Sequence, residues 1–100
     1  MSRNDYPATA VYNARWAIIR NWELRAGGKR KAGTPIGWAR ANQLHRGANL
    51  SDETIKRTYS YLSRARPIAG PGRNETRASI AYNLWGGDAM LRWTKKVLNK

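Results

Sequence analysis

Residues 34–65 have the sequence TPIGWARANQLHRGANLSDETIKRTYSYLSRA, which contains two helix starts and the stop between them. Thr34 suits the N-cap position of a helix, and Pro35 suits the first helical position. Gly47 ends this helix, and Ser51 caps a second helix whose first turn carries two acids that favour the helix dipole. The segment therefore predicts two adjoining helices, residues 34–46 and 51–65, joined by a short link.

The apolar residues of both helices recur at three- and four-residue spacing, as one buried helix face requires. These positions are Ile36, Ala39, Ala41 and Leu44 in the first helix, and Ile55, Thr58, Tyr59 and Leu62 in the second. Pro67 limits how far the second helix extends, because proline removes one helical hydrogen bond and crowds the preceding turn. A helix-turn-helix has this arrangement, and a plain helical corner has the same sequence pattern.

An N-terminal helix precedes the pair. Pro7 suits its first turn, with Asp5 as the candidate cap, and Gly27-Gly28 ends it. Its apolar residues at helical spacing are Val11, Ile18, Ile19 and Trp22. Residues 27–33 then predict a basic loop bounded by glycines.

Two further helices follow the pair. Residues 67–74 hold two prolines and two glycines and predict the longest break in the chain. Asn74 or Glu75 opens the next helix, and Gly86-Gly87 ends it. Asp88 caps a last helix that carries lysines in its final turn, where they suit the helix dipole.

The sequence thus predicts an all-α protein, a compact bundle of four to five short helices with a helix-turn-helix-like pair. We expect residues 1–100 to form a single domain, in which residues 1–33 supply the N-terminal helix and basic loop and residues 34–100 the rest. Five Trp and five Tyr supply bulk for a core, since each buries about 150–250 Å². Trp22 and Trp85 are predicted core residues.

The strongest functional signal is charge. Nineteen Lys and Arg residues against six Asp and Glu give a net charge of +13. A small domain with this excess repels itself unless a polyanion neutralises it, and nucleic acid does so with release of counterions. Nucleic acid is therefore the first partner to consider, an anionic membrane surface the second and an acidic protein the third.

The composition argues against several other classes. The chain has no Cys, which excludes disulfides and thiolate metal sites, and its single His45 cannot build a histidine-rich metal site. No apolar stretch approaches the ~20 residues that span a bilayer, so no membrane association is expected. The scattered acids suggest helix caps and surface partners rather than paired catalytic groups. We therefore expect a protein that is not an enzyme and has no cofactor or metal.

Basic residues outside the predicted core face are the candidate phosphate contacts. They are Lys29, Arg30 and Lys31 in the basic loop, Arg40 on the first helix of the pair, and Lys56, Arg57 and Arg64 on the second. Trp38 lies off the apolar stripe of its helix and is the candidate for base stacking. Asp52 and Glu53 would repel phosphate at the end of the helix where recognition helices usually meet bases. Backbone contact is therefore favoured over sequence reading.

Four segments from residue 34 onward resemble a short module of tailed-bacteriophage proteins. These segments are Thr34-Pro35-Ile36-Gly37-Trp38-Ala39-Arg40-Ala41, Gly47-Ala48-Asn49-Leu50-Ser51, Ile55-Lys56-Arg57-Thr58-Tyr59-Ser60-Tyr61-Leu62-Ser63-Arg64 and Ile80-Ala81-Tyr82-Asn83-Leu84-Trp85-Gly86-Gly87-Asp88-Ala89. The resemblance covers about two-thirds of the chain. That module occurs alone or appended to phage head and structural proteins. Here Ala65-Arg66 stands where His-Glu usually follows in the module, and the loop after it is shorter and more basic.

Together, charge and resemblance predict a small basic phage protein that binds nucleic acid, with duplex DNA favoured, mainly through the phosphate backbone. One alternative is a structural or packaging-associated virion protein, with virion proteins as additional partners. The other is an inhibitor of an acidic host protein. All three imply a location in the host cytoplasm or the virion.

Overall fold

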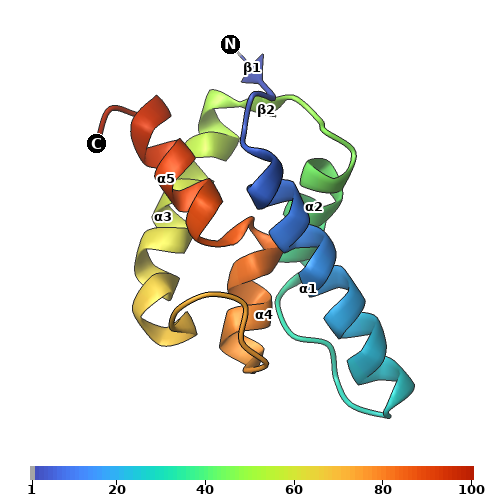
Figure 1. Ribbon diagram of the computed structural model, residues 1–100. Helices are drawn as coiled ribbons and strands as arrows, with labels where there is room; N and C mark the ends of the chain where they lie inside the picture. The colour runs from blue at the N-terminus through green and yellow to red at the C-terminus, as the bar shows by residue number, and fades with distance from the viewer. Residues whose placement is uncertain (1) are drawn as a thin grey trace.

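Residues 2–100, described by a computed structural model, form five α-helices and one very short strand pair (Figure 1). The helices are α1 (Ala8–Ala26), α2 (Pro35–His45), α3 (Asp52–Ala69), α4 (Arg77–Leu84) and α5 (Gly87–Val97). The prediction of an all-α bundle of short helices is confirmed. The strands β1 (Ser2–Arg3) and β2 (Leu50–Ser51) pair antiparallel and tie the N-terminus to the start of α3. At two residues each, they are too short to show alternation in sequence.

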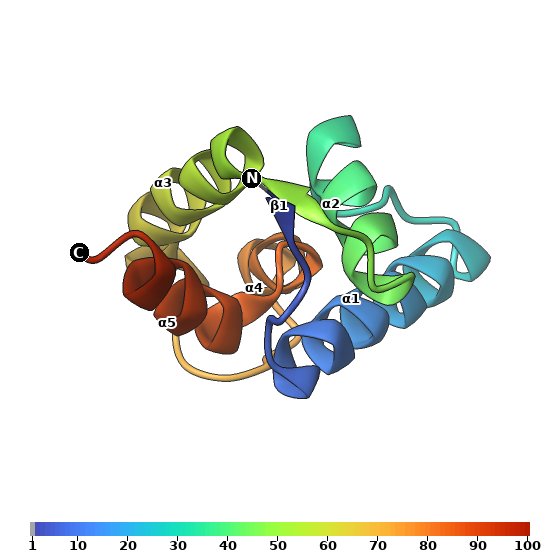
Figure 2. The same cartoon turned by 90° about the horizontal axis from the view of Figure 1, so that it is seen from above.

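The short helix α4 lies at the centre of the bundle. Figure 2 shows it surrounded by the other helices, and each of those four packs against it. Its buried residues lie on several sides of the helix; they are Ser79, Ile80, Tyr82, Asn83 and Leu84. Because α4 intervenes, α2 and α3 lie on different sides of it and pack against it rather than closely against each other (Figure 2).

Two predicted helix starts are confirmed by their hydrogen bonds. The Thr34 hydroxyl accepts from the Gly37 amide at 3.2 Å, with Pro35 at the first helical position. The Ser51 hydroxyl accepts from the Thr54 amide, also at 3.2 Å. Each bond satisfies a backbone donor that the first helical turn otherwise leaves without a partner.

Two other predicted caps are wrong, because the acids involved have stronger partners. Pro7 occupies the N-cap of α1, and Asp5 instead accepts from Arg3 at 3.0 Å. Gly86 occupies the N-cap of α5, where its φ of 107° suits glycine. Asp88 lies one residue inside that helix and accepts from the buried Tyr82 hydroxyl at 2.6 Å.

The predicted start of the fourth helix is also displaced. Thr76, not Asn74 or Glu75, is the N-cap of α4, and its hydroxyl accepts from the Ser79 amide at 3.1 Å. The Asn74 side chain accepts from the Thr76 amide at 3.0 Å and so folds the loop in front of the helix. Glu75 pairs with Arg20 of α1 at 3.1 Å.

Pro67 does not end α3, which continues to Ala69. The hydrogen bond that Pro67 cannot donate, and the crowding of the preceding turn by its ring, both fall near the end of a long helix, where the helix still continues for two residues. Gly70, with φ of 75°, is the residue that ends α3.

The predicted apolar stripe of α1 is only partly buried. Trp22 is 63% exposed and Ile19 47% exposed, so the prediction that Trp22 belongs to the core is wrong. The buried face of α1 consists mainly of small and amide side chains; its residues are Ala10, Asn13, Ala14, Ala17, Ile18 and Asn21. Small residues let α1 approach α2, α4 and α5 closely, which a stripe of larger side chains would prevent.

The stripe predicted for α2 shows a similar difference, since Ile36 is 57% exposed and Ala39 is exposed, while Ala41 and Leu44 are buried. The predictions for Trp85 and for three of the four stripe residues of α3 hold, whereas Tyr59 is only half-buried and lines a surface hollow. Ile55, Thr58 and Leu62 are buried, and Trp85 is 7% exposed. These large side chains therefore fill the space around α4.

The Gly86-Gly87 turn is fixed by two asparagines. The buried Asn13 side chain of α1 donates to the Gly86 carbonyl at 2.9 Å. Gly87 has φ of 64°, and a Cβ there would lie 2.7 Å from the Asn13 amide nitrogen and would also overlap the Asn83 side chain. Only glycine therefore fits this turn, which joins α4 to α5 and packs both against α1.

Candidate nucleic-acid interface

The outer face of α3, opposite its core stripe, carries cations and hydroxyl groups. Lys56, Arg57 and Arg64 are exposed, as is Ser63, while Ser60 is half-buried. Residues 54–66 contain no acid, so the face is uniformly basic beyond the first turn of the helix. We call this surface, Lys56, Arg57, Ser60, Ser63 and Arg64, the α3 basic face. Lysine, arginine and serine side chains of this kind contact phosphate oxygens in protein–DNA complexes.

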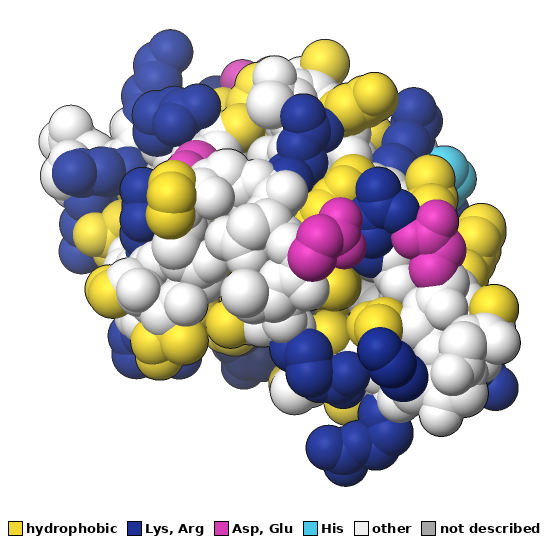
Figure 3. Space-filling view, turned by 60° about the horizontal axis from the view of Figure 1, so that its bottom comes forward, with side chains coloured by type: hydrophobic (Ala, Val, Ile, Leu, Met, Phe, Trp, Pro, Cys, Tyr) yellow, Lys and Arg dark blue, Asp and Glu magenta, His cyan; other side chains and the backbone are white. Residues whose placement is uncertain are grey.

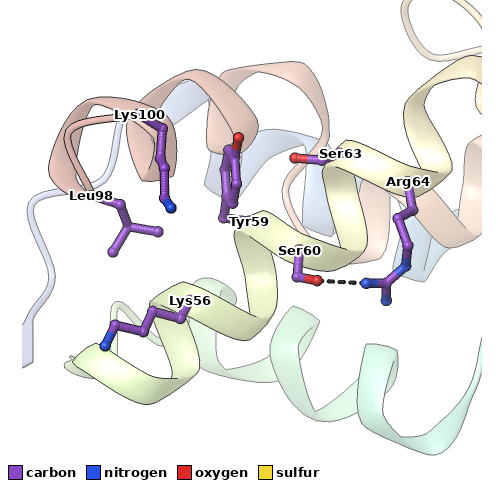
Figure 4. A pocket seen from close by; sticks show the side chains of 7 residues that line it. All are labelled: Lys56, Tyr59, Ser60, Ser63, Arg64, Leu98 and Lys100. Atoms are coloured by element: carbon purple, nitrogen blue, oxygen red, sulfur yellow. Dashed lines mark hydrogen bonds between the residues drawn. The ribbon is translucent and has the colours of Figure 1, made fainter.

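A surface hollow of about 550 Å³ lies between α3 and the C-terminal segment that follows α5 (Figure 4). It is lined by Lys56, Tyr59, Ser60, Ser63 and Arg64 of α3 and by Leu98 and Lys100. In Figure 4 the Tyr59 ring stands between the segment with Leu98 and Lys100 and the two serines of α3. The Arg64 guanidinium donates to the Ser60 hydroxyl at 2.5 Å, which orients it along the helix. No Asp or Glu side chain lines the hollow.

Arg57 and Arg40 approach each other across the gap between α3 and α2. Glu53 accepts from Arg57 at 2.9 Å and partly neutralises it. The Arg40 guanidinium lies 5.7 Å from the Trp85 ring centroid and donates to Gln43 at 2.8 Å. Burial, with a smaller contribution from the Arg57 charge, lowers the pKa of Arg40. An anion at this position would relieve the repulsion between the two arginines.

The predicted basic loop is anchored rather than free. The Arg77 guanidinium of α4 donates to the carbonyls of Arg30 and Lys31 at 2.8 and 2.6 Å. The Ala32 amide donates to the buried Asn21 side chain of α1 at 2.6 Å. The backbone of the loop is therefore held in place while its three cationic side chains remain exposed.

Helix α2 separates the predicted site residues into two groups. Trp38 is half-buried, and the Lys31 ammonium lies 4.4 Å from its ring centroid, so Trp38 belongs to the basic loop. Arg40 follows two residues later, which places it about 160° around a helix, toward Trp85 and α3. The structure thus groups Lys29, Arg30, Lys31, Trp38 and Arg77 on one side, and Arg40 with the α3 basic face on the other.

Trp38 is a weaker candidate for base stacking than its sequence position suggested, because Lys31 already covers its ring. Sequence reasoning missed three contributors: Arg77, which fixes the loop, and Tyr59 and Lys100, which line the hollow. Tyr59 has the spacing of a core residue, and Lys100 reaches α3 only because α5 packs against that helix. No local pattern in the sequence indicates either contact.

Five acidic side chains pair with arginines, and of those arginines Arg57 alone is a candidate phosphate contact. Asp5 pairs with Arg3, Glu23 and Glu75 with Arg20, Glu53 with Arg57, and Asp88 with Arg66. Within residues 2–100, the basic loop, Arg40, Lys56 and Arg64 form no ion pair with an acidic side chain. Figure 3 shows Lys and Arg side chains in several groups over one face of the molecule, with only a few acids between them. The uncompensated charge therefore lies where it can meet a polyanion.

Other chemistries find little support in the described part of the chain. His45 ends α2 and its Nδ1 accepts from Arg15 at 3.0 Å. Residues 2–100 contain no group of three His, Cys, Asp or Glu side chains that could hold a metal ion. None of the helices formed by these residues has the length and apolar character required to cross a lipid bilayer.

Comparison of the chain with protein-family models, with curated proteins and with solved structures found no match in any of the three.

Proposed function

We propose that this protein binds nucleic acid, with duplex DNA as the favoured ligand, chiefly through phosphate contacts and without enzymatic activity. The observation that carries the proposal is the α3 basic face, whose cations lie on a rigid helix beside an acid-free hollow. Lys56 and Arg64 lie eight residues apart, about 12 Å along the helix, so the two cations can contact two different phosphates.

The net charge of +13 supports the same function, since the six acids can neutralise at most six of the nineteen Lys and Arg side chains. The anchored basic loop supplies a second group of phosphate contacts. Because α2 and α3 do not pack closely against each other, backbone contact by α3 is favoured over insertion as the second helix of a helix-turn-helix. Together with the resemblance to a phage module, this fits a protein that contacts phage DNA in the host cytoplasm or in the virion, where packaging is the related role.

A salt series tests this function directly. If about six phosphates are contacted, the logarithm of the affinity falls with the logarithm of the salt concentration at a slope near −5. Affinity for random-sequence duplex DNA then drops about a thousandfold between roughly 50 and 200 mM salt. Fluorescence anisotropy with a labelled duplex measures this slope, and binding that does not respond to salt would contradict the proposal.

A matched pair of double variants locates the interface. Lys56→Ala with Arg64→Ala removes two cations from the α3 basic face and should flatten the slope by about 1.8. Arg92→Ala with Lys96→Ala removes the same charge from a different hollow, beside α1, and should leave the slope nearly unchanged. If both double variants flatten the salt slope equally, DNA affinity depends only on overall charge and not on the α3 basic face.

A second candidate function is binding of an acidic protein, and one observation favours it. An apolar groove of about 310 Å³ lies between α1 and α2, lined by Ile18, Ile19 and the exposed Trp22 beside Arg15 and His45. Apolar surface of this kind contributes to protein–protein contact and not to phosphate contact. Trp22→Ser should leave DNA affinity unchanged if the first function holds, whereas an acidic partner seated in the groove would be released by the same change.

A further inference from the structure

The hollow beside α3 combines two kinds of lining that a phosphate backbone alone would not need. The first kind is a cationic and hydroxyl rim of Lys56, Arg64 and Lys100 with Ser60 and Ser63. The second is an apolar surface made by the half-buried Tyr59 ring and Leu98. A ligand that satisfies both must join a negative charge to a flat apolar group.

The polar groups of the hollow are also available. Among the described residues, the Tyr59 and Ser63 hydroxyls have no hydrogen-bond partner, and Lys56 and Lys100 have no ion pair. Arg64 is oriented by its bond to Ser60, which leaves its other nitrogens directed to solvent or ligand. The volume of about 550 Å³ lies within the range of about 300–1,000 Å³ that small-molecule sites occupy.

Resting on the proposed function, we infer that this hollow binds one unpaired nucleotide of the bound nucleic acid. The base lies against Tyr59 and Leu98, its phosphate meets Lys56 and Lys100, and Arg64, turned toward Ser60, contacts a neighbouring phosphate of the same strand. A base inside a duplex is stacked on both faces and paired along its edge, so it cannot present a face of its ring to Tyr59. An unpaired base at a strand end or a gap presents its flat face freely, and aromatic side chains bind such faces with little regard to sequence. The favoured ligand is therefore duplex DNA that ends in, or is interrupted by, a single strand.

The test compares two labelled DNAs in anisotropy titrations of the full chain. One is a blunt duplex of about 20 base pairs, and the other carries an added single-stranded tail of about four thymidines. We expect the tailed duplex to bind about 5- to 100-fold more tightly, the gain that stacking of one base provides. Equal affinity for both DNAs would overturn the inference and leave the proposed function intact. Failure of both to bind would overturn the proposed function itself.

Variants of Tyr59 separate the ring from the fold. Tyr59→Phe keeps the ring and should keep the preference for the tailed duplex. Tyr59→Leu keeps apolar bulk but removes the ring, and it should lose the preference while its affinity for blunt duplex changes less than about twofold. Tyr12→Leu is the matched control, because Tyr12 is an exposed tyrosine on α1, outside the hollow. A preference that survives Tyr59→Leu would overturn the assignment of the base to this ring.

Free nucleotide provides the last arm of the test. Soluble dTMP has the same phosphate and base but lacks the flanking backbone that the α3 basic face would hold. We expect tailed duplex to outcompete dTMP by at least about a hundredfold, since each additional phosphate contact adds affinity. Tighter binding of dTMP than of tailed DNA would make the hollow a site for soluble nucleotides and overturn the inference.

Discussion

Gly87→Ala tests the account of the turn between α4 and α5. Gly87 has φ of 64°, a left-handed conformation that costs an alanine about 1–2 kcal/mol. The new Cβ would also lie 2.7 Å from the Asn13 amide nitrogen, which donates to the Gly86 carbonyl. Displacement of that buried hydrogen bond costs about 1–3 kcal/mol more. We therefore expect a loss of about 2–5 kcal/mol in the free energy of unfolding, a large share of the roughly 5–15 kcal/mol of a typical domain.

Gly28→Ala is the matched control for that substitution. Gly28 has φ of 78°, so an alanine there meets the same backbone strain, but its Cβ would have nothing within 4 Å. Only about 1–2 kcal/mol should be lost. Urea unfolding followed by tryptophan fluorescence gives both values under the same conditions. If Gly87→Ala destabilises the protein no more than Gly28→Ala does, the packing assigned to the two asparagines is refuted.

Three further predictions concern pH, packing and binding. Burial and the hydrogen bond to Asp88 raise the pKa of Tyr82 above its ordinary value of about 10. The fold therefore favours the neutral phenol, which stabilises the protein below about pH 10, and this stabilisation is lost as the pH rises above that value. In urea unfolding at alkaline pH, Tyr82→Phe should lose less of its free energy of unfolding than the unmodified protein does. Trp85→Ala should lower the free energy of unfolding by about 3–5 kcal/mol, whereas Trp22→Ala, at an exposed position, should lower it by less than about 0.5 kcal/mol. Calorimetry that finds Trp22→Ala the more destabilising of the two would contradict the packing described for α1. Replacement of residues 29–31 by alanine should weaken binding to all DNA sequences about equally and flatten the salt slope by up to about 3, and a change in sequence preference would argue against pure backbone contact.

The helix starts that were predicted correctly depend on a few neighbouring residues. Thr34 and Ser51 each accept a hydrogen bond from an amide three positions later, a contact that involves only neighbouring residues and so leaves a pattern in the local sequence. Asp5 and Asp88 fit the same pattern, but each has an arginine within 3.0 Å, which no local pattern indicates. Local signals therefore predicted where the helices lie but not always which side chain begins them.

The types of residue that form the site could be predicted from the sequence, but their arrangement in space could not. The cations of α3 follow from the position of its apolar stripe, because Ile55, Thr58 and Leu62 define the buried face. The candidate site residues fall into a basic-loop group and an α3 group because of the way α2 is rotated against α4. The spacing of apolar residues in α1 did not indicate that Trp22 is exposed, because the small residues of α1, and not its large apolar ones, make the close contacts with the other helices.

The central position of α4 has a consequence for the order in which the protein folds. Helix α1 is synthesised first, yet the helices that cover it include α4 and α5, which leave the ribosome more than fifty residues later. Until then the alanine-rich face of α1 remains in water, and α2 and α3 have no common helix to pack against. We therefore expect folding to finish only after synthesis of residues 77–97, in a single late step that joins both ends of the chain.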